Sequence, residues 1–369
     1  MHDFEKVAAD PRFSFLGNVD VGNDITVPEL QRYYNAIVVA AGASDDRKLN
    51  IPGEDELTGV LAARSFVNWY NGHPSFRNLH VPLDCDTAVV VGQGNVAVDC
   101  ARILTKTRDE LAATDISQHA LDALAASGIK TVYLVGRRGS AQAAFTMKEL
   151  REITKLPHTD CIVDPNELAQ SMNDASAEEI QSSRPQRRIH ELLIGAIKVE
   201  RNVLQGAPHH QRAVRAGAFE TIPCGLVLRS IGYKSIPFAG VPFDVKRHVI
   251  PNVAGRVTAS ASPDAPVVPG LYCAGWIKRG PSGIIGTNIN CARDTVASVL
   301  SDEGSLPPLT LQPVAELHAK LRESGAPIVD WDMYRRIEAA EDAAGAAKGK
   351  PREKLTSIED MLAVATQGH

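Results

Sequence analysis

The most informative stretch of this chain is TAVVVGQGNVAVDCAR, residues 87–102. Its apolar, β-branched run Val89–Val91 predicts a buried parallel strand, and Gly92 permits the tight turn that follows. Gly94 lets the backbone approach a pyrophosphate, and a helix beginning at Asn95 offers free N–H groups and a positive dipole end. The G-x-G-x-x-A pattern predicts a dinucleotide site, although an ordinary strand-turn-helix made of small residues shows the same pattern.

A second apolar run, Thr131–Val135, ends in Gly136, Arg137 and Arg138. A site selective for NAD carries an acidic residue near this point, which accepts the ribose 2′-hydroxyl. Two guanidinium groups suit a 2′-phosphate instead, because arginine binds phosphate with a rigid, multidentate fork. Taken alone, the pair also fits a solvated strand end. Together with the glycine turn, it predicts NADP(H) rather than NAD(H) as the cofactor.

The crossover between these two strands is long, because residues 107–130 are inserted before the second strand. An acidic residue about 20 positions after the glycines would fall near Asp115. No strand is predicted to precede Asp115, so we interpret it as loop or helix-cap material.

Composition sets broad limits on what the chain can be. It has 369 residues, of which 44% are hydrophobic and 22% charged, enough for a large core and two domains. A net charge of −5 argues against general nucleic-acid binding, and no apolar run has the length of a transmembrane segment. The six scattered cysteines lack metal-ligand spacing and are expected to be buried thiols in a reducing compartment. No targeting peptide is visible at the N-terminus.

Further segments outline the organisation of the chain. Residues 36–39 predict a buried strand, and the rigid turn at 51–54 is typical of a passage between domains. Residues 225–231 predict another buried strand. Residues 270–288 combine a short strand, an aromatic residue and a glycine-rich turn before a helix. The Ala-, Gly- and charge-rich tail at 338–350 is expected to be flexible or loosely packed.

Seven motifs together identify a family. They are GNVDVGNDITVPEL (17–30), VNWYNG (67–72), CDTAVVVGQGNVAVDCARIL (85–104), VGRRG with FTMKELRE (135–152), PCGLVLRSIGYKS (223–235), GLYCAGWIKRGPSGIIGTN (270–288) and GKPREKL (349–355). Through them, residues 13–369 resemble the NADPH:adrenodoxin (ferredoxin) oxidoreductases of mitochondria and bacteria. The resemblance implies an FAD enzyme that takes hydride from NADPH and passes single electrons to a [2Fe–2S] ferredoxin, and it implies mitochondrial placement.

The resemblance also implies roles for individual residues. Those assigned to the NADP site are Gln93, Gly94, Asn95 and Val96 around the pyrophosphate, next to the turn glycine Gly92, then Arg137 and Arg138 at the 2′-phosphate, and Glu149. Those assigned to the flavin site are Val21 beside the adenosine and Trp276, Gly283, Ile284 and Ile285 along the flavin. Asp99 matches an acidic residue near the redox centre, and Asp99 and Trp276 are the candidate catalytic residues. A helix-surface or capping carboxylate explains Asp99 equally well.

A basic cluster of Arg184, Arg187 and Arg188 stands out on a chain that is acidic overall. Arg184 and Arg188 match positions that the family uses to dock its acidic electron acceptor. The alternative is a solvated charge run with no partner.

Two departures from the family pattern affect the flavin. Nothing before Phe13 supplies the family's FAD-binding strand with its own G-x-G-x-x-G turn, and the chain looks shortened at 193–198. We therefore expect weak FAD binding to this chain.

These observations predict an α/β fold with two Rossmann-like dinucleotide-binding domains. The expected NADP domain, residues 46–238, is inserted into an N-terminally truncated FAD domain formed by residues 1–45 and 239–369. One alternative is an NADP-binding protein without FAD or reductase activity. A disulfide reductase is disfavoured because a CxxC-type redox pair is missing, and a glutamate-synthase-type small subunit because no cysteine cluster is present.

Overall fold

Two compact units make up the chain. The computed structural model describes residues 2–163, 171–193, 202–205, 207–215, 221–283, 285–306, 313–323, 325 and 327–367. Unit 1 comprises Met1–Arg47, Gly232–Glu338 and Leu362–His369, and unit 2 comprises Lys48–Ile231 and Ala339–Met361. The chain therefore crosses between the units at residues 47/48, 231/232, 338/339 and 361/362. From the sequence, the first two crossings were expected at 45/46 and 238/239, and no others were expected. The assignment of the units to particular cofactors remains a prediction.

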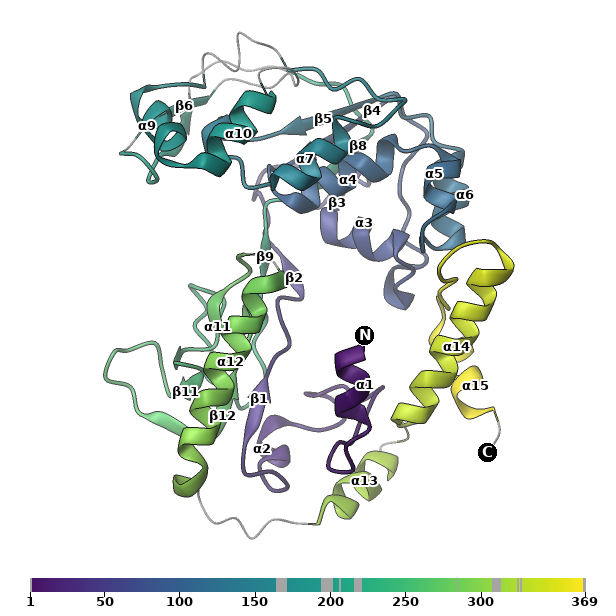
Figure 1. The fold of residues 1–369 in the computed structure, drawn as a ribbon, viewed down its shortest axis with the longest axis vertical. Helices are drawn as coiled ribbons and strands as arrows, with labels where there is room; N and C mark the ends of the chain where they lie inside the picture. Colours follow the sequence, from purple (N-terminus) through teal and green to yellow (C-terminus); the bar gives the residue numbers. More distant parts are fainter. Residues whose placement is uncertain are drawn as a thin grey trace. The chain divides into compact units, whose positions relative to one another are not determined.

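Unit 2 is built on a four-stranded parallel sheet in the order β3-β8-β4-β5 (Figure 1). Its strands are β3 (Val60–Ala62), β8 (Leu226–Arg229), β4 (Thr87–Val91) and β5 (Thr131–Val135). The strands predicted at 89–91, 131–135 and 225–231 are thereby confirmed. Val90 of β4 and Leu228 of β8 are completely buried, as expected for the centre of a parallel sheet that helices cover on both faces.

Between residues 48 and 231, the other described elements connect the sheet strands along the chain. They are α3 (Ala63–Tyr70), η1 (Pro74–Phe76), α4 (Asn95–Thr105), α5 (Arg108–Ala112), α6 (Gln118–Ala125), η2 (Ser140–Gln142), α7 (Met147–Ile153), α9 (Asp174–Ser182), α10 (Arg184–Leu193), β6 (Asn202–Gln205) and β7 (Arg212–Arg215). The long crossover at 107–130 forms α5 and α6, and Asp115 lies in the turn between them. An apolar cluster packs α4, α7 and α10 together through Val98, Leu150 and Ile189.

Unit 1 contains a mixed sheet in the order β1-β12-β11-β10 and a two-stranded ribbon, β2-β9. The strands are β1 (Ile37–Val39), β2 (Asp45–Asp46), β9 (Tyr233–Lys234), β10 (Asn252–Val253), β11 (Arg256–Thr258) and β12 (Val267–Cys273). The helices are α1 (His2–Ala8), α2 (Val27–Leu30), α11 (Trp276–Arg279), α12 (Ile285–Asp302), η3 (Glu303–Ser305) and α13 (Val314–Glu323). Helices α14 (Trp331–Ala347) and α15 (Ile358–Thr366) contribute residues to both units.

Two expectations about burial are wrong. β1 was expected to be a buried strand; Val39 is buried, but Val38, whose side chain points to the opposite face of the sheet, is 45% exposed. The cysteines were all expected to be buried, but Cys224 is exposed and Cys85 and Cys161 are half-buried. Cys100, Cys273 and Cys291 are buried, and all six are free thiols.

The tail at 338–350 is ordered, which corrects the expectation of a flexible segment. Most of it belongs to α14, and Glu338 and Glu341 are buried. Gly345 permits close packing rather than flexibility, because a Cβ there would lie 2.5 Å from the Cα of Arg352. The chain after α14 therefore folds back across the helix.

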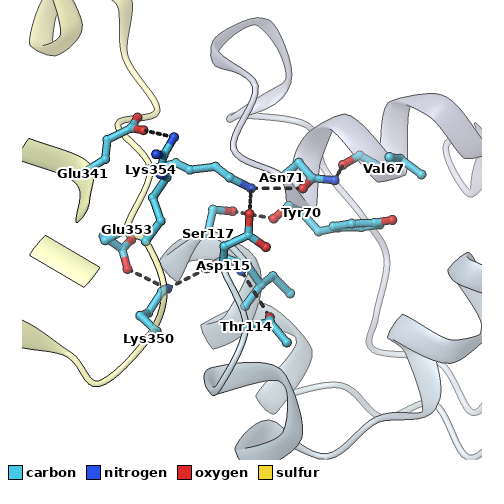
Figure 2. Close-up of polar contacts among 12 residues, drawn as sticks. Val67, Tyr70, Asn71, Thr114, Asp115, Ser117, Glu341, Lys350, Glu353 and Lys354 are labelled. Atoms are coloured by element: carbon cyan, nitrogen blue, oxygen red, sulfur yellow. Dashed lines mark hydrogen bonds and ion pairs between the residues drawn. The ribbon is translucent and has the colours of Figure 1, made fainter. Parts of the chain in front are cut away.

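The GKPREKL segment, residues 349–355, is bound to the crossover of unit 2 (Figure 2). Lys350 donates to the carbonyl of Ile116 (2.7 Å) and forms an ion pair with Glu353 (2.7 Å). Lys354 forms an ion pair with Asp115 (2.7 Å). Asp115 thus lies in a loop, as predicted, and anchors this C-terminal segment. No helix in the described part of the chain has the length and apolar character needed to span a membrane.

Candidate functional site

Three strand ends meet at the glycine turn of unit 2. Gly92 follows β4 with φ +144°, and a Cβ at this position would lie 2.1 Å from the carbonyl oxygen of Ser230, which follows β8. The backbone N–H of Gly92 donates to the carbonyl of Val135 at the end of β5 (2.7 Å). A side chain is therefore excluded at Gly92. The carboxyl ends of neighbouring parallel strands are where ligands bind in open α/β sheets.

The N-terminus of α4 opens onto free space. Gly94 is its N-cap, without a side-chain cap, and a Cβ on Gly94 would meet no atom of the described residues within 4 Å. The first N–H groups of a helix have no intrahelical acceptor, and together with the dipole they favour an anion. The turn is held from the side, since Asn95 Oδ1 accepts from the N–H of Thr146 (2.7 Å) and the Gln93 carbonyl from that of Ala144 (2.9 Å). This cradle fits a pyrophosphate.

The two arginines after β5 lie close to the same turn. Gly136, immediately before them, packs against the Gln93 side chain, because a Cβ there would lie 1.9 Å from Gln93 Cδ. Arg137 and Arg138 are both exposed at a bend in the chain. Their position at the end of β5 agrees with the position predicted for binding a 2′-phosphate.

Asp99 lies in a cluster of charged residues on α4 and α7. Arg102 forms ion pairs with Asp99 (2.7 Å) and with Glu152 (2.5 Å). Burial raises the pKa of Asp99 above its ordinary value, Arg102 opposes this rise, and the carboxylates of Glu149 and Glu152 add to it. Glu149 Oε2 is buried without a hydrogen-bond partner among the described residues. The structure therefore brings Asp99 and Glu149 together in unit 2.

Trp276 begins α11 in unit 1, so the two candidate catalytic residues lie in different units. Its ring stacks on that of Tyr233, with centroids 5.6 Å apart and planes inclined by 25°. The Trp276 Nε1 is buried without a hydrogen-bond partner in the described part of the chain. A half-buried aromatic plane with an unsatisfied donor fits the ring system of a flavin, which offers both a flat face and hydrogen-bond acceptors.

The glycine-rich turn after Trp276 is held together by Arg279. This side chain donates to the carbonyl of Ser282, to Asn288 Oδ1 (2.6 Å) and to Thr287 Oγ1 (3.0 Å). Gly283 has φ +82° and is exposed, which allows close approach of a ligand to the backbone.

Three other flavin contacts were predicted, at Val21, Ile284 and Ile285. Ile284 lies outside the described residues, and Ile285 is described only as the first residue of α12. The predicted helix at 288–300 therefore starts three residues earlier. Val21 is 36% exposed in a loop of unit 1.

Sequence reasoning missed three residues that hold the site in place. Thr146 fixes Asn95, Arg279 closes the glycine-rich turn, and Tyr233 stacks on Trp276. Thr146 and Arg279 belong to quoted motifs, but each partner becomes adjacent only after folding. Among the described residues, no group of three His, Cys, Asp or Glu side chains is arranged to hold a metal ion.

Fold and site together define an α/β oxidoreductase with two Rossmann-like dinucleotide-binding units. No model of a known protein family matches the chain. It is 40% identical to the mitochondrial NADPH:adrenodoxin oxidoreductase of Arabidopsis thaliana, covering 99% of this chain and 84% of that protein. It is 42% identical to the human mitochondrial protein of the same name, covering 98% and 80%. The solved structure of Mycobacterium tuberculosis FprA in complex with NADPH superposes with a TM-score of 0.89 at 38% identity, covering 99% and 86%. This chain belongs to the NADPH:adrenodoxin oxidoreductase family, which confirms the resemblance.

Proposed function

We propose that this chain transfers electrons from NADPH through FAD to a [2Fe–2S] ferredoxin. The observation that carries the proposal is the pair of exposed arginines at the end of β5, beside a glycine turn that excludes side chains. The proposal is also supported by relatives, because the chain is similar over nearly its full length to NADPH:adrenodoxin oxidoreductases and to a protein whose structure was solved with NADPH.

NADPH is held by unit 2 in this proposal. The pyrophosphate lies at the turn formed by Gly92–Gly94 and at the N–H groups of Asn95 and Val96. Arg137 and Arg138 bind the 2′-phosphate, since guanidinium groups form multidentate bonds to phosphate. Glu149, whose buried Oε2 lacks a partner among the described residues, accepts a hydrogen bond from the cofactor.

FAD is held by unit 1, with Trp276, Gly283, Ile284 and Ile285 along the flavin and Val21 near the adenosine. Bound FAD would supply the redox chemistry by accepting hydride from NADPH and releasing electrons singly. The protein's share is to position the reacting groups and exclude water. Asp99, whose pKa is raised mainly by burial, is an acidic residue of the redox centre. The visible absorbance of the purified chain measures its flavin directly.

Removing both arginines tests the cofactor assignment. Each charge-assisted contact to the 2′-phosphate is worth about 1.5–3 kcal/mol, so Arg137→Ala with Arg138→Ala should weaken NADPH binding at least about tenfold. NADH, which lacks this phosphate, should bind almost as before. Arg108→Ala is the control, because Arg108 is an exposed arginine on α5 of the same unit. Equal losses for NADPH and NADH in a direct binding titration would contradict the assignment.

The ferredoxin is proposed to dock on α10. Arg184 and Arg188 are exposed and lie one helical turn apart, so they share a face, whereas Arg187 donates to the carbonyl of Gln181 (2.6 Å). Ferredoxins of this kind are acidic, and charges at the rim of an interface steer association. Arg184→Glu and Arg188→Glu should weaken ferredoxin binding more at low than at high salt. NADPH binding should be unchanged, and Arg108→Glu is the matched control. If both α10 variants bind ferredoxin with the affinity of the native protein, the arginine cluster is not a docking site.

Mitochondrial placement is supported by the names of the Arabidopsis and human relatives. FprA, which comes from the bacterium M. tuberculosis, is 38% identical to this chain, close to the identity of the mitochondrial relatives. Imaging of the tagged protein in its own cells tests the placement.

A further inference from the structure

A buried carboxylate is hydrogen-bonded to η2, the short helix that follows the two arginines. Glu179 on α9 is only 1% exposed. Its Oε1 accepts from the backbone N–H of His209 (2.7 Å) and from Gln211 Nε2 (2.9 Å), and its Oε2 accepts from Gln142 Nε2 (2.9 Å). A buried carboxylate is unfavourable unless hydrogen bonds replace its water. Three N–H donors do so here, two from residues 209–211 and one from η2.

These hydrogen bonds keep Glu179 ionised and therefore a pure acceptor. Burial alone would raise its pKa, but the hydrogen bonds from Gln211, Gln142 and His209 outweigh burial and hold the pKa below its ordinary value. Gln142 must then present its amide nitrogen to the carboxylate. Its amide oxygen is left buried without a partner in the described part of the chain. The contact with Glu179 thus fixes the orientation of Gln142.

The loop between β5 and α7 is fastened on both sides of the arginines. Gly136, before them, packs against Gln93 of the glycine turn. After them, Ser140 Oγ lies 2.7 Å from His190 Nδ1 of α10, and Gln142 is held by Glu179. η2 packs on both α9 and α10. Residues 137–139 lie between these fixed points, and Gly139 packs against Ser171.

We propose that Glu179 is a positioning residue for recognition of the 2′-phosphate, because by holding Gln142 it fixes the backbone from which Arg137 and Arg138 extend. This inference rests on the proposed function of the two arginines. Long arginine side chains lose conformational freedom when they bind the phosphate. If the backbone that carries them is already fixed, only the side chains must be ordered on binding. Without the anchor, the arginines should bind phosphate less well while the rest of the site is preserved.

Two adenosine nucleotides provide a test that does not depend on flavin or turnover. Adenosine 2′,5′-bisphosphate carries the phosphate in question, and adenosine 5′-monophosphate lacks it. Gln142→Ala and Glu179→Gln should each weaken binding of the bisphosphate about threefold to tenfold by calorimetric titration. The monophosphate should bind as in the native protein. Glu178→Gln, the same change at the exposed neighbour on α9, is the matched control.

A double-mutant cycle separates positioning from general loosening. In a protein that already carries Arg137→Ala and Arg138→Ala, Gln142→Ala should have almost no further effect on the bisphosphate. If the arginine variant binds the bisphosphate normally, the proposed function fails. If that variant loses affinity while Gln142→Ala and Glu179→Gln do not, the positioning inference alone is overturned. Equal weakening for both nucleotides, or additive effects in the cycle, also overturns it. Gln142→Ala leaves two hydrogen bonds of Glu179 in place, so it decides the question if Glu179→Gln does not fold.

Discussion

Lys350 offers a sharp test of how the C-terminal segment is attached to unit 2. Its side chain is 3% exposed, donates to the carbonyl of Ile116 (2.7 Å) and forms an ion pair with Glu353 (2.7 Å), whose side chain is 14% exposed (Figure 2). The substitution Lys350→Met keeps an unbranched side chain, one atom shorter, and removes the charge. The half-buried Glu353 carboxylate then loses one of its two lysine partners, and the buried carbonyl of Ile116 loses its donor.

The size of the effect follows from burial. Removing one partner of a buried ion pair costs about 3–5 kcal/mol, because the other charge is left uncompensated. Glu353 keeps Lys348 at 3.3 Å, and the new thioether buries apolar surface, so we expect the lower end, about 3 kcal/mol. Lys354 provides the control in the same segment. Its partner Asp115 is 52% exposed, and solvent screening should reduce the cost of Lys354→Met to below about 1 kcal/mol.

Urea unfolding followed by tryptophan fluorescence, to which Trp69 in the core of unit 2 contributes, measures both changes. The shift in midpoint multiplied by the slope gives the difference in free energy of unfolding. Hydrogen exchange of residues 349–355 reports whether the segment detaches before the unit unfolds. The reasoning is refuted if Lys350→Met and Lys354→Met shift the midpoint equally, because burial would then not decide the cost.

Two further predictions concern the glycine turn and acid stability. Gly92→Ala should destabilise unit 2 by at least about 2 kcal/mol, because of the positive φ and the contact with Ser230, whereas Gly94→Ala should retain native stability and lose NADPH affinity. Urea unfolding and NADPH titration check this pair, and a destabilised Gly94→Ala would contradict it. Glu29 has its pKa lowered from 4.5 to about 2, first by Lys320 and then by Thr26, so its contribution to stability is complete above about pH 4.5 and lost as the pH falls through about 2. Unfolding measured from pH 5 to about pH 2 should therefore be less pH-dependent in Glu29→Gln, and an unchanged pH dependence would exclude this role.

Local sequence determined the core of the nucleotide-binding unit. The β-branched run before Gly92, the glycine turn and the helix from Asn95 are predictable because each depends on neighbours within a few residues. The same holds for β5, which matches the predicted Thr131–Val135. The residues that favour a strand, a turn or a helix start act over a few positions, so these elements depend little on the rest of the structure.

Tertiary structure decided which side chains meet. The sequence of residues 338–350 is typical of a flexible tail, yet Glu341 and Lys350 are buried because the chain folds back over Gly345. Glu179 looks like an ordinary helix-surface carboxylate in sequence. Its donors Gln142 and Gln211 are 37 and 32 positions away, and only folding brings their amides within hydrogen-bond distance. Burial and long-range hydrogen bonds depend on the packing of distant segments, and no local pattern in the sequence encodes that packing.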